Sequence, residues 1–268
     1  MTVFTILIAY YNNYDYFVDC YKSILSQTYQ NFEIIIVDDF STDDSYRKVV
    51  ALTNNNPKVK IFQNTENRGV GFTKRRCMEM ASGEICGFLD PDDALVDSAL
   101  QISIDNHTAK NVATYSQFYL CHKNLTPIRI FQHSRSIKNG DKHFFNIFLE
   151  ANHFTTFKKS AYDKTSGINQ DLTSAVDQDL YLKLYDVGSF KFINTPLYYY
   201  RLHENGISQE ASKKDNLNQN WHRVLHDTAN RRNLKSLYCK NITDINNLPE
   251  YLKSKQNSFF IKMLRKFF

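Results

Sequence analysis

Several features that the sequence lacks narrow the class of protein. No apolar stretch reaches the ~18 residues that a membrane-spanning helix needs. The five cysteines are odd in number and have no CxxC spacing, which argues against a disulfide framework and a zinc site. No basic leader or small-residue cleavage site accompanies the first apolar run, so we expect a strand there rather than a signal peptide. With 42% hydrophobic and 23% charged residues, the sequence predicts a soluble globular protein of the cytoplasm.

The net charge of +5 is unevenly distributed along the chain. Residues 211–268 hold 12 Lys and Arg against four acids, whereas residues 1–210 hold 21 against 24. We therefore expect a slightly acidic body over 1–210 and a basic helical extension over 211–268. At its end, residues 258–268 interleave bulky apolar residues with cations, which favours peripheral contact with an anionic membrane, although docking on the body or on another subunit stays open. Nucleic acid is disfavoured, because no groove-binding motif accompanies the charge.

Short apolar strands alternate with helical patterns through the first 90 residues. We expect strands over residues 5–9, 32–37, 59–62 and 84–89, and helices over 16–27, from 41 or 42 to about 52, and over 69–81. This alternation predicts an α/β fold with right-handed crossovers and a mostly parallel sheet covered by helices on both faces. Further strands are expected over 113–120 and 190–193, and a helix over 220–237.

Three carboxylates follow the apolar run that ends at Leu89, namely Asp90, Asp92 and Asp93. Like charges crowd together at a cost unless a cation holds them, and hard oxygen ligands suit Mg²⁺ or Mn²⁺ carried on phosphate oxygens. The alternative is an Asp-rich turn that caps the next helix. The residues after the first and second strands should reach the same edge of the sheet, because ligands collect at the carboxyl ends of parallel strands. This convergence favours a metal–nucleotide site.

The segment Asn67-Arg68-Gly69-Val70-Gly71 is not a dinucleotide fingerprint, because it lacks the third glycine and follows the third strand rather than the first. We interpret it as a turn into a helix that carries Lys74, Arg75 and Arg76. Some of these cations could approach a diphosphate. At least two of the three are expected on a solvated helix face, since consecutive helical residues point in different directions.

Together these motifs resemble the inverting family 2 glycosyltransferases of the GT-A fold, from about Thr5 to Ser208. Ala9-Tyr10-Tyr11-Asn12 stands where that family reads Pro-x-Tyr-Asn, residues 38–43 stand for Asp-Asp-Gly-Ser-Thr-Asp, and residues 88–93 stand for its DXD element. Ala9 replaces proline and Phe40 replaces glycine. We expect the second change to reshape the loop beside the base pocket.

The resemblance implies a nucleotide-sugar donor, usually a UDP-sugar. Its uracil and ribose would lie against Ala9, Tyr11 and Asp39, and Asp90 would contact the ribose or the metal shell. Asp92 would bind a Mn²⁺ or Mg²⁺ ion that bridges the diphosphate. The predicted nucleotide-binding residues also include Asn67, Gly69 and Lys74.

A second acidic pattern lies where Leu180 and Leu184 share one face of a predicted helix. Its acids fall in the first turn, where helix capping is the default role. The resembling family reads Glu-Asp-x-Asp-Leu-x-Leu here and draws its catalytic base from it. By that match the base is Asp177, with Val176 in place of the glutamate and Asp179 structural, although Asp179 as the base stays open.

The segment from Tyr198 to Ser208 resembles the Tyr-Arg-x-His-x-x-x-x-Ser close of these catalytic domains. His203 is thereby a candidate metal ligand and Arg201 a candidate phosphate contact, with packing as the alternative for the histidine. The expected function is a metal-dependent inverting glycosyltransferase acting on a glycan or lipid-linked acceptor at the inner membrane face, in the synthesis of cell-surface polysaccharide. Two alternatives stay open: a nucleotidyltransferase, whose glycine-rich phosphate loop is missing after the first strand, and a non-catalytic nucleotide-binding subunit.

Overall fold

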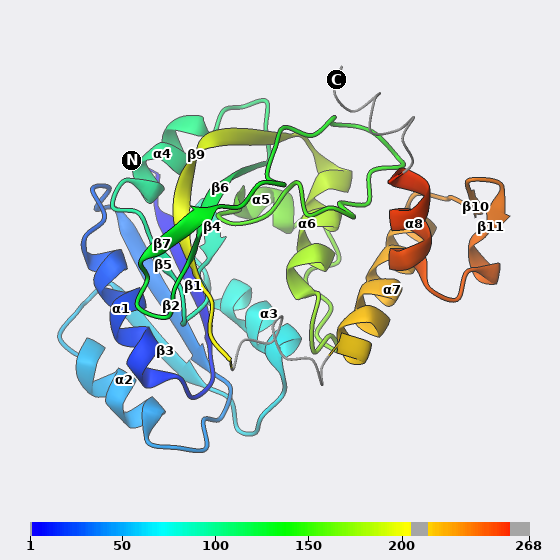
Figure 1. The fold of residues 1–268 in the computed structure, drawn as a ribbon. Helices are drawn as coiled ribbons and strands as arrows, with labels where there is room; N and C mark the ends of the chain where they lie inside the picture. The colour runs from blue at the N-terminus through cyan, green and yellow to red at the C-terminus, as the bar shows by residue number, and fades with distance from the viewer. Residues whose placement is uncertain (1, 205–213, 258–268) are drawn as a thin grey trace.

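The computed structural model describes residues 2–204 and 214–257, and shows a large mixed sheet between two sets of helices (Figure 1). The strands of this sheet are β1 (Phe4–Tyr10), β2 (Phe32–Asp38), β3 (Val59–Gln63), β4 (Ile85–Phe88), β5 (Ala94–Leu95), β6 (Ala113–Cys121), β7 (Pro127–Ile130), β8 (Thr156–Lys158) and β9 (Phe190–Arg201). The helices of the body are α1 (Tyr14–Leu25), α2 (Ser45–Thr53), α3 (Val70–Met80), α4 (Ala99–Asn106), α5 (Lys159–Tyr162) and α6 (Val176–Val187). The sheet order is β3-β2-β1-β4-β8-β6-β9-β5, with β7 paired to β6.

The first half of the sheet is parallel. β1 pairs with β2 from Phe4↔Phe32 to Tyr10↔Asp38. β4 pairs with the other side of β1, and β3 with the other side of β2, both in parallel register. The predicted alternation of strands and helices is therefore confirmed. Because the strands run in one direction, the segments that follow β1, β2 and β4 all emerge at one edge of the sheet.

Alternate residues of these strands pack against two separate cores. In β1, Leu7 belongs to the core on the side of α3, while Ile6 and Ile8 belong to the core on the side of α1. Both faces are covered, which explains why β1 and β2 each contain a continuous apolar run, residues 6–9 and 34–37. The covered sheet provides a rigid base for the loops at its edge.

The second half of the sheet is mixed. β8 runs antiparallel to β4 and β6, while β6 and β9 are parallel. β9 spans 12 residues, so the strand expected over 190–193 is much longer than the sequence indicated. It pairs with the short β5 through Ala94↔Tyr199, which brings the end of β9 beside the acidic segment after β4.

The described part of the extension is α7 (Lys214–Arg231), the hairpin of β10 (Ser236–Leu237) and β11 (Lys240–Asn241), the 3₁₀-helix η2 (Ile242–Asp244) and α8 (Leu248–Gln256). Val224 and Leu225 of α7 and Leu252 of α8 share the core that contains Leu180 of α6. The prediction of a helix over 220–237 is wrong at its C-terminal end, because α7 ends at Arg231 and the chain then turns. The domain boundary at residue 210 stays a prediction, and the segment 258–268 lies outside the described residues. Among the described residues, no helix is long and apolar enough to cross a membrane.

Candidate active site

The acidic residues predicted to converge do meet at the carboxyl edge of the parallel strands. Asp39 follows β2, Asp90 and Asp92 follow β4, and Asp177 lies in the first turn of α6. Lys74 of α3, whose side chain is 5% exposed, links two of these acids, Asp90 and Asp177. Its Nζ lies 2.8 Å from Oδ1 of Asp177 and 3.1 Å from Oδ1 of Asp90.

This bridge shifts the pKa of Lys74 and of Asp90. Burial works to lower the pKa of Lys74, but Asp177 and Asp90 outweigh it and raise the pKa well above its ordinary value. Burial likewise works to raise the pKa of Asp90, and the Lys74 ammonium reverses that shift and lowers it. Asp90 is therefore held as a carboxylate, and Lys74 stays protonated.

Asp39 is buried and organises the turn before α3. Its Oδ1 accepts from Asn64 Nδ2 at 2.7 Å and from the amide of Arg68 at 2.9 Å, and its Oδ2 accepts from the amide of Gly69 at 2.8 Å. Gly69 has φ +84°, a conformation that favours glycine. Asn67 lies exposed in the same turn. Sequence reasoning missed Asn64, and nothing in its local pattern identifies it as a partner of Asp39.

Asp92 pairs with a histidine from the end of the sheet. Oδ2 of Asp92 lies 2.7 Å from Nε2 of His203, which follows β9 and has a side chain only 2% exposed. The ring of Tyr16 packs on this imidazole, with centroids 4.8 Å apart. Arg201 Nε donates to the Asp92 carbonyl at 2.5 Å, and its guanidinium lies over the Tyr16 ring. The predicted metal pair is thus in contact, whereas Arg201 binds protein groups.

The oxygen and imidazole donors of Asp92 and His203 suit Mn²⁺ or Mg²⁺ as far as ligand type is concerned. Within residues 2–204 and 214–257, however, no three His, Cys, Asp or Glu side chains converge closely enough to hold a metal ion. An ion at this pair would need further ligands, such as diphosphate oxygens or water.

The third acid of the motif, Asp93, has a structural position. It is buried, and it accepts from Tyr198 Oη and from the amide of Arg201, each at 2.7 Å. Burial, followed by the charges of Asp92 and Asp90, raises the pKa of Asp93 well above its ordinary value. Asp93 therefore ties the acidic loop to β9.

The two acids in the first turn of α6 differ clearly. Asp179 is 2% exposed, and its Oδ2 accepts from Lys183 Nζ at 2.7 Å and from the amide of Asn169 at 2.8 Å. The side chain of Asp177 is about a third exposed and faces Lys74. Asp179 thus holds the preceding loop on the helix, and Asp177 is the more accessible of the two.

The loops after β1 and β2 are hydrogen-bonded to each other. The amide of Asp39 donates to Tyr10 O at 2.7 Å, and the amide of Asn12 donates to Ser41 Oγ at 2.8 Å. Ala9 lies half-buried in β1, and the side chain of Tyr11 is exposed. The residues predicted to contact the base therefore lie next to Asp39.

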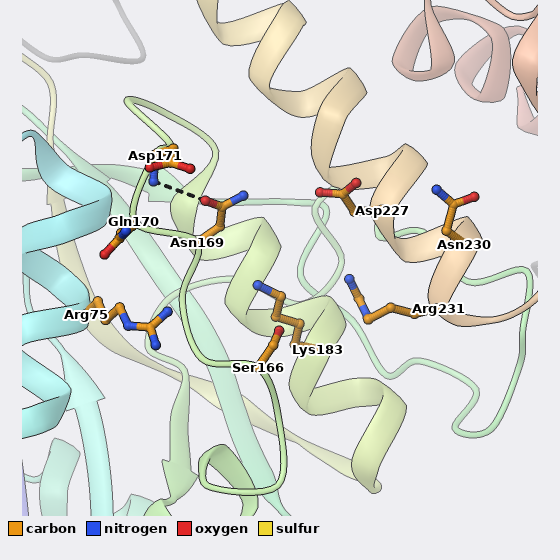
Figure 2. A pocket seen from close by; sticks show the side chains of 9 residues that line it. All are labelled: Arg75, Ser166, Asn169, Gln170, Asp171, Lys183, Asp227, Asn230 and Arg231. Atoms are coloured by element: carbon orange, nitrogen blue, oxygen red, sulfur yellow. Dashed lines mark hydrogen bonds between the residues drawn. The ribbon is translucent and has the colours of Figure 1, made fainter.

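A separate cavity of about 490 Å³ lies between α3, the loop before α6, and α7, and it shares no residue with the acidic cluster (Figure 2). Three cations line it, and each has a protein partner. Arg75 donates to Ile168 O, Lys183 pairs with Asp179, and Arg231 pairs with Asp186. Arg75 thus joins α3 to the loop before α6, and Arg231 joins α7 to α6. Of the cations predicted after Gly71, Lys74 alone reaches the acidic cluster, and Arg76 Nη1 donates to Gln63 O at 2.9 Å.

Two solved structures share the architecture of this chain. The S. aureus TarS structure of residues 1–349 in complex with UDP-GlcNAc matches with a TM-score of 0.69 and 20% identity, covering 85% of this chain and 66% of that one. The mannosyltransferase PcManGT from Pyrobaculum calidifontis, in complex with GDP-Man and Mn²⁺, matches with a TM-score of 0.61 and 16% identity, covering 86% of this chain and 64% of that one. At these identities the likeness concerns the fold, and it confirms the GT-A class.

Sequence relatives narrow the class. The chain belongs to glycosyl transferase family 2, whose family model matches residues 5–166, and the predicted family is confirmed. A chondroitin synthase from Escherichia coli is 30% identical over 257 residues, which are 94% of this chain and 36% of that protein. The E. coli glucosyltransferase WfaP, which acts on UDP-Glc and GlcNAc-diphosphoundecaprenol, is 29% identical over 220 residues, 80% of this chain and 83% of that one. The chain thus spans little more than a third of the chondroitin synthase.

Proposed function

We propose that this glycosyltransferase is a metal-dependent, inverting enzyme that moves a sugar from a UDP-sugar to a hydroxyl group of a glycan or lipid-linked acceptor. The observation that carries the proposal is the Lys74 bridge, which joins Asp90 of the donor edge to Asp177 of α6. An inverting transfer needs a base on one side of the sugar and a stabilised diphosphate on the other. Two carboxylates from separate elements that share one cation suit this arrangement.

The donor would bind at the loops after β1, β2 and β3. Ala9 and Tyr11 would contact the uracil and ribose. Oδ2 of Asp39 accepts a hydrogen bond from the Gly69 amide, and a carboxylate oxygen can accept a second one, here from the imide N–H of the base. Asn67 lies exposed at the same turn, where it is available to a nucleotide. The TarS complex with UDP-GlcNAc supports a UDP-sugar for this fold.

A divalent cation, Mn²⁺ or Mg²⁺, would be held by Asp92 and His203 together with diphosphate oxygens. Magnesium sites of this kind commonly use one or two protein ligands and complete their shell with phosphate and water. When bound, such an ion neutralises the charge that develops on the departing UDP. The Lys74 ammonium lies beside Asp90, where it adds positive charge on the diphosphate side.

Asp177 is the proposed base, and Asp179 is not. A base must reach the acceptor hydroxyl, and Asp177 is partly exposed whereas Asp179 is buried against Lys183. Asp177 would remove the proton as the acceptor oxygen attacks the anomeric carbon.

The acceptor class is proposed from the relatives. One is a chondroitin synthase, and WfaP acts on a sugar linked to diphosphoundecaprenol. A growing glycan or its lipid-linked precursor at the inner face of the membrane, in the synthesis of cell-surface polysaccharide, suits both. Contact of residues 258–268 with anionic lipid would place the enzyme beside such an acceptor, and it remains a prediction from the sequence.

The direct test is an incubation of the protein with Mn²⁺ and a panel of UDP-sugars, followed by measurement of released UDP. Release of UDP from one donor, abolished by EDTA and restored by Mn²⁺, is the expected result. Pyrophosphate released from a nucleoside triphosphate and a sugar phosphate would instead indicate a nucleotidyltransferase. Binding of UDP without turnover of any donor, with glycan and lipid-linked acceptors supplied, would indicate a non-catalytic nucleotide-binding subunit.

A further inference from the structure

Two exposed aromatic residues lie on hydrogen-bonded neighbouring loops at the predicted base pocket. The cross-loop hydrogen bonds from the Asp39 amide to Tyr10 O and from the Asn12 amide to Ser41 Oγ enclose one residue on each side. These enclosed residues are Tyr11, which is 42% exposed, and Phe40, which is 46% exposed. Tyr11 and Phe40 therefore lie on neighbouring backbone segments, and Phe40 directly follows Asp39 in the chain.

Phe40 is in a conformation that its side chain disfavours. Its φ is +60°, in the left-handed region, where a β-carbon meets the following carbonyl and where glycine is normally preferred. The surrounding turn requires this conformation, because Asp38 binds the amide of Ser41 at 3.0 Å. A glycine would fit here without strain, so the ring is retained against a backbone cost.

Burial does not offset that cost. A ring that stays almost half exposed gains little from the hydrophobic effect, since the gain scales with the apolar area removed from water. Left-handed non-glycine residues are concentrated at ligand-binding sites, where a ligand completes their contacts. The exposed part of the Phe40 ring, directly after Asp39 at the predicted base pocket, is therefore available to a ligand.

We propose that Phe40 contacts the base of the nucleotide donor and, with Tyr11, forms the aromatic surface on which that base packs. The inference rests on the proposed function and adds a residue to the donor site that determines affinity for the base. Nucleobases stack on aromatic rings whatever their hydrogen-bonding pattern. Asp39, directly before Phe40, would then supply the hydrogen bond and Phe40 the stacking surface.

The test separates the base from the diphosphate. The affinities of UDP and of inorganic pyrophosphate are measured by calorimetry with Mn²⁺, for the wild type and for Phe40→Leu. Leucine keeps the β-carbon, the left-handed strain and an apolar side chain, and removes only the ring. We expect UDP affinity to fall about 5- to 100-fold, and pyrophosphate affinity to stay unchanged. Phe40→Tyr, which keeps the ring, should bind UDP within about twofold of the wild type.

A matched control is available at Tyr238, which is 43% exposed, has φ +47° and lies in the β10–β11 hairpin. Tyr238→Leu should leave the affinities for UDP and pyrophosphate unchanged. If wild-type protein binds UDP and Phe40→Leu binds it equally well, the inference is overturned while the proposed function stands. Equal losses for UDP and pyrophosphate would also overturn it, because Phe40 would then act on the diphosphate side. A wild type that binds no UDP would refute the proposed function itself.

Discussion

Both edges of the parallel sheet hold acidic side chains that are paired with lysine, but the surroundings of these acids differ. At the amino edge, Glu33 of β2 accepts from Thr5 Oγ1 at 2.7 Å, from the Ser82 amide at 2.7 Å and from Lys60 Nζ at 2.8 Å. At the carboxyl edge, Asp90 and Asp177 share the single ammonium of Lys74. One acid has several donors at the first edge, and two acids have one cation at the second.

This difference separates a stabilising site from a reactive one. The side chain of Glu33 is 10% exposed, whereas those of Asp90 and Asp177 are 31% and 32% exposed. A carboxylate that is fully hydrogen-bonded and buried contributes to stability and has little capacity for a ligand. Acids that keep exposed oxygens around a shared cation cost stability and can bind or accept a proton, which is the usual compromise of active sites.

The largest effect is expected for Asp177→Asn. Loss of a general base should lower the rate of UDP release from the active donor by about a thousandfold. UDP binding and the melting temperature should change little, because Lys74 keeps Asp90 as its counterion. The matched variant is Asp179→Asn, which removes charge from the buried pair with Lys183 and should lower the melting temperature instead.

This prediction distinguishes the two acids directly. An Asp177→Asn protein that keeps a tenth or more of the wild-type rate, while Asp179→Asn at a temperature where it is folded does not, would assign the base to Asp179. Rates are compared at saturating UDP-sugar, so that weaker donor binding is not mistaken for slower chemistry.

Lys74→Met tests the shared cation. Removing it leaves Asp90 and Asp177 close together without a counterion, and the free energy of unfolding at pH 7 should fall by about 3 to 5 kcal/mol. Because Lys74 lowers the pKa of Asp90 in the folded state, its contribution is present above the carboxyl's ordinary pKa and is lost as the pH falls below it. The difference in the free energy of unfolding between Lys74→Met and the wild type, measured by urea titration, should therefore become smaller below about pH 4.

A matched variant keeps the charge at this position. Lys74→Arg should lose much less stability than Lys74→Met, although the larger guanidinium has to fit a buried site. If Lys74→Met is as stable as the wild type at pH 7, the two acids do not depend on this cation, and the comparison between the edges fails.

The sequence predicted the parallel half of the sheet because the signal there is local. Residues 34–37 form a continuous apolar run, and every residue of β2 is buried. It did not predict the length of β9. Asn194, Thr195 and Pro196 interrupt the apolar pattern, and the structure accommodates them as an irregularity in the pairing with β6 between Ser116 and Gln117. Pairing with a distant strand, not local pattern, sets where β9 ends.

The same distinction between local and distant signals applies to the helices and the site. The helix expected to reach residue 237 stops at Arg231, and Asn233 follows with φ +56°, a left-handed residue of the kind that ends helices. The acidic motifs were visible individually. The bond from Lys74 to Asp177 joins residues 103 positions apart, and no local pattern marks it. Motifs therefore predict which residues gather, and packing decides which of them touch.

Glu33→Gln tests the stabilising edge. Burial works to raise the pKa of Glu33, but hydrogen bonds from Lys60, Thr5 and Ser82 outweigh it and lower the pKa to about 2. A lowered pKa means that the stabilisation is fully present above the ordinary pKa of glutamate and is lost as the pH falls towards 2. We expect Glu33→Gln to cost up to about 3 kcal/mol at pH 7.

The activity of the Glu33→Gln protein provides the contrast with the carboxyl edge. UDP release, measured well below its melting temperature, should match the wild type, because Glu33 lies at the opposite end of the strands from Asp177. A loss of stability that persists unchanged at pH 2 would contradict the ionic origin of the effect.

The smallest effects are expected for two glycine substitutions, one at each edge of the sheet. An alanine β-carbon at Gly71 would lie 2.5 Å from the carbonyl oxygen of Leu172, in the loop that leads to Asp177, and one at Gly83 would lie 2.7 Å from Val3 O at the amino edge. Backbone atoms must move in both cases, so Gly71→Ala and Gly83→Ala should each lower the free energy of unfolding by about 1 to 3 kcal/mol. Only Gly71→Ala should also slow UDP release by folded protein, because its loop positions the proposed base. Equal rates for the two variants at equal stability would show that the loop does not transmit its displacement to Asp177.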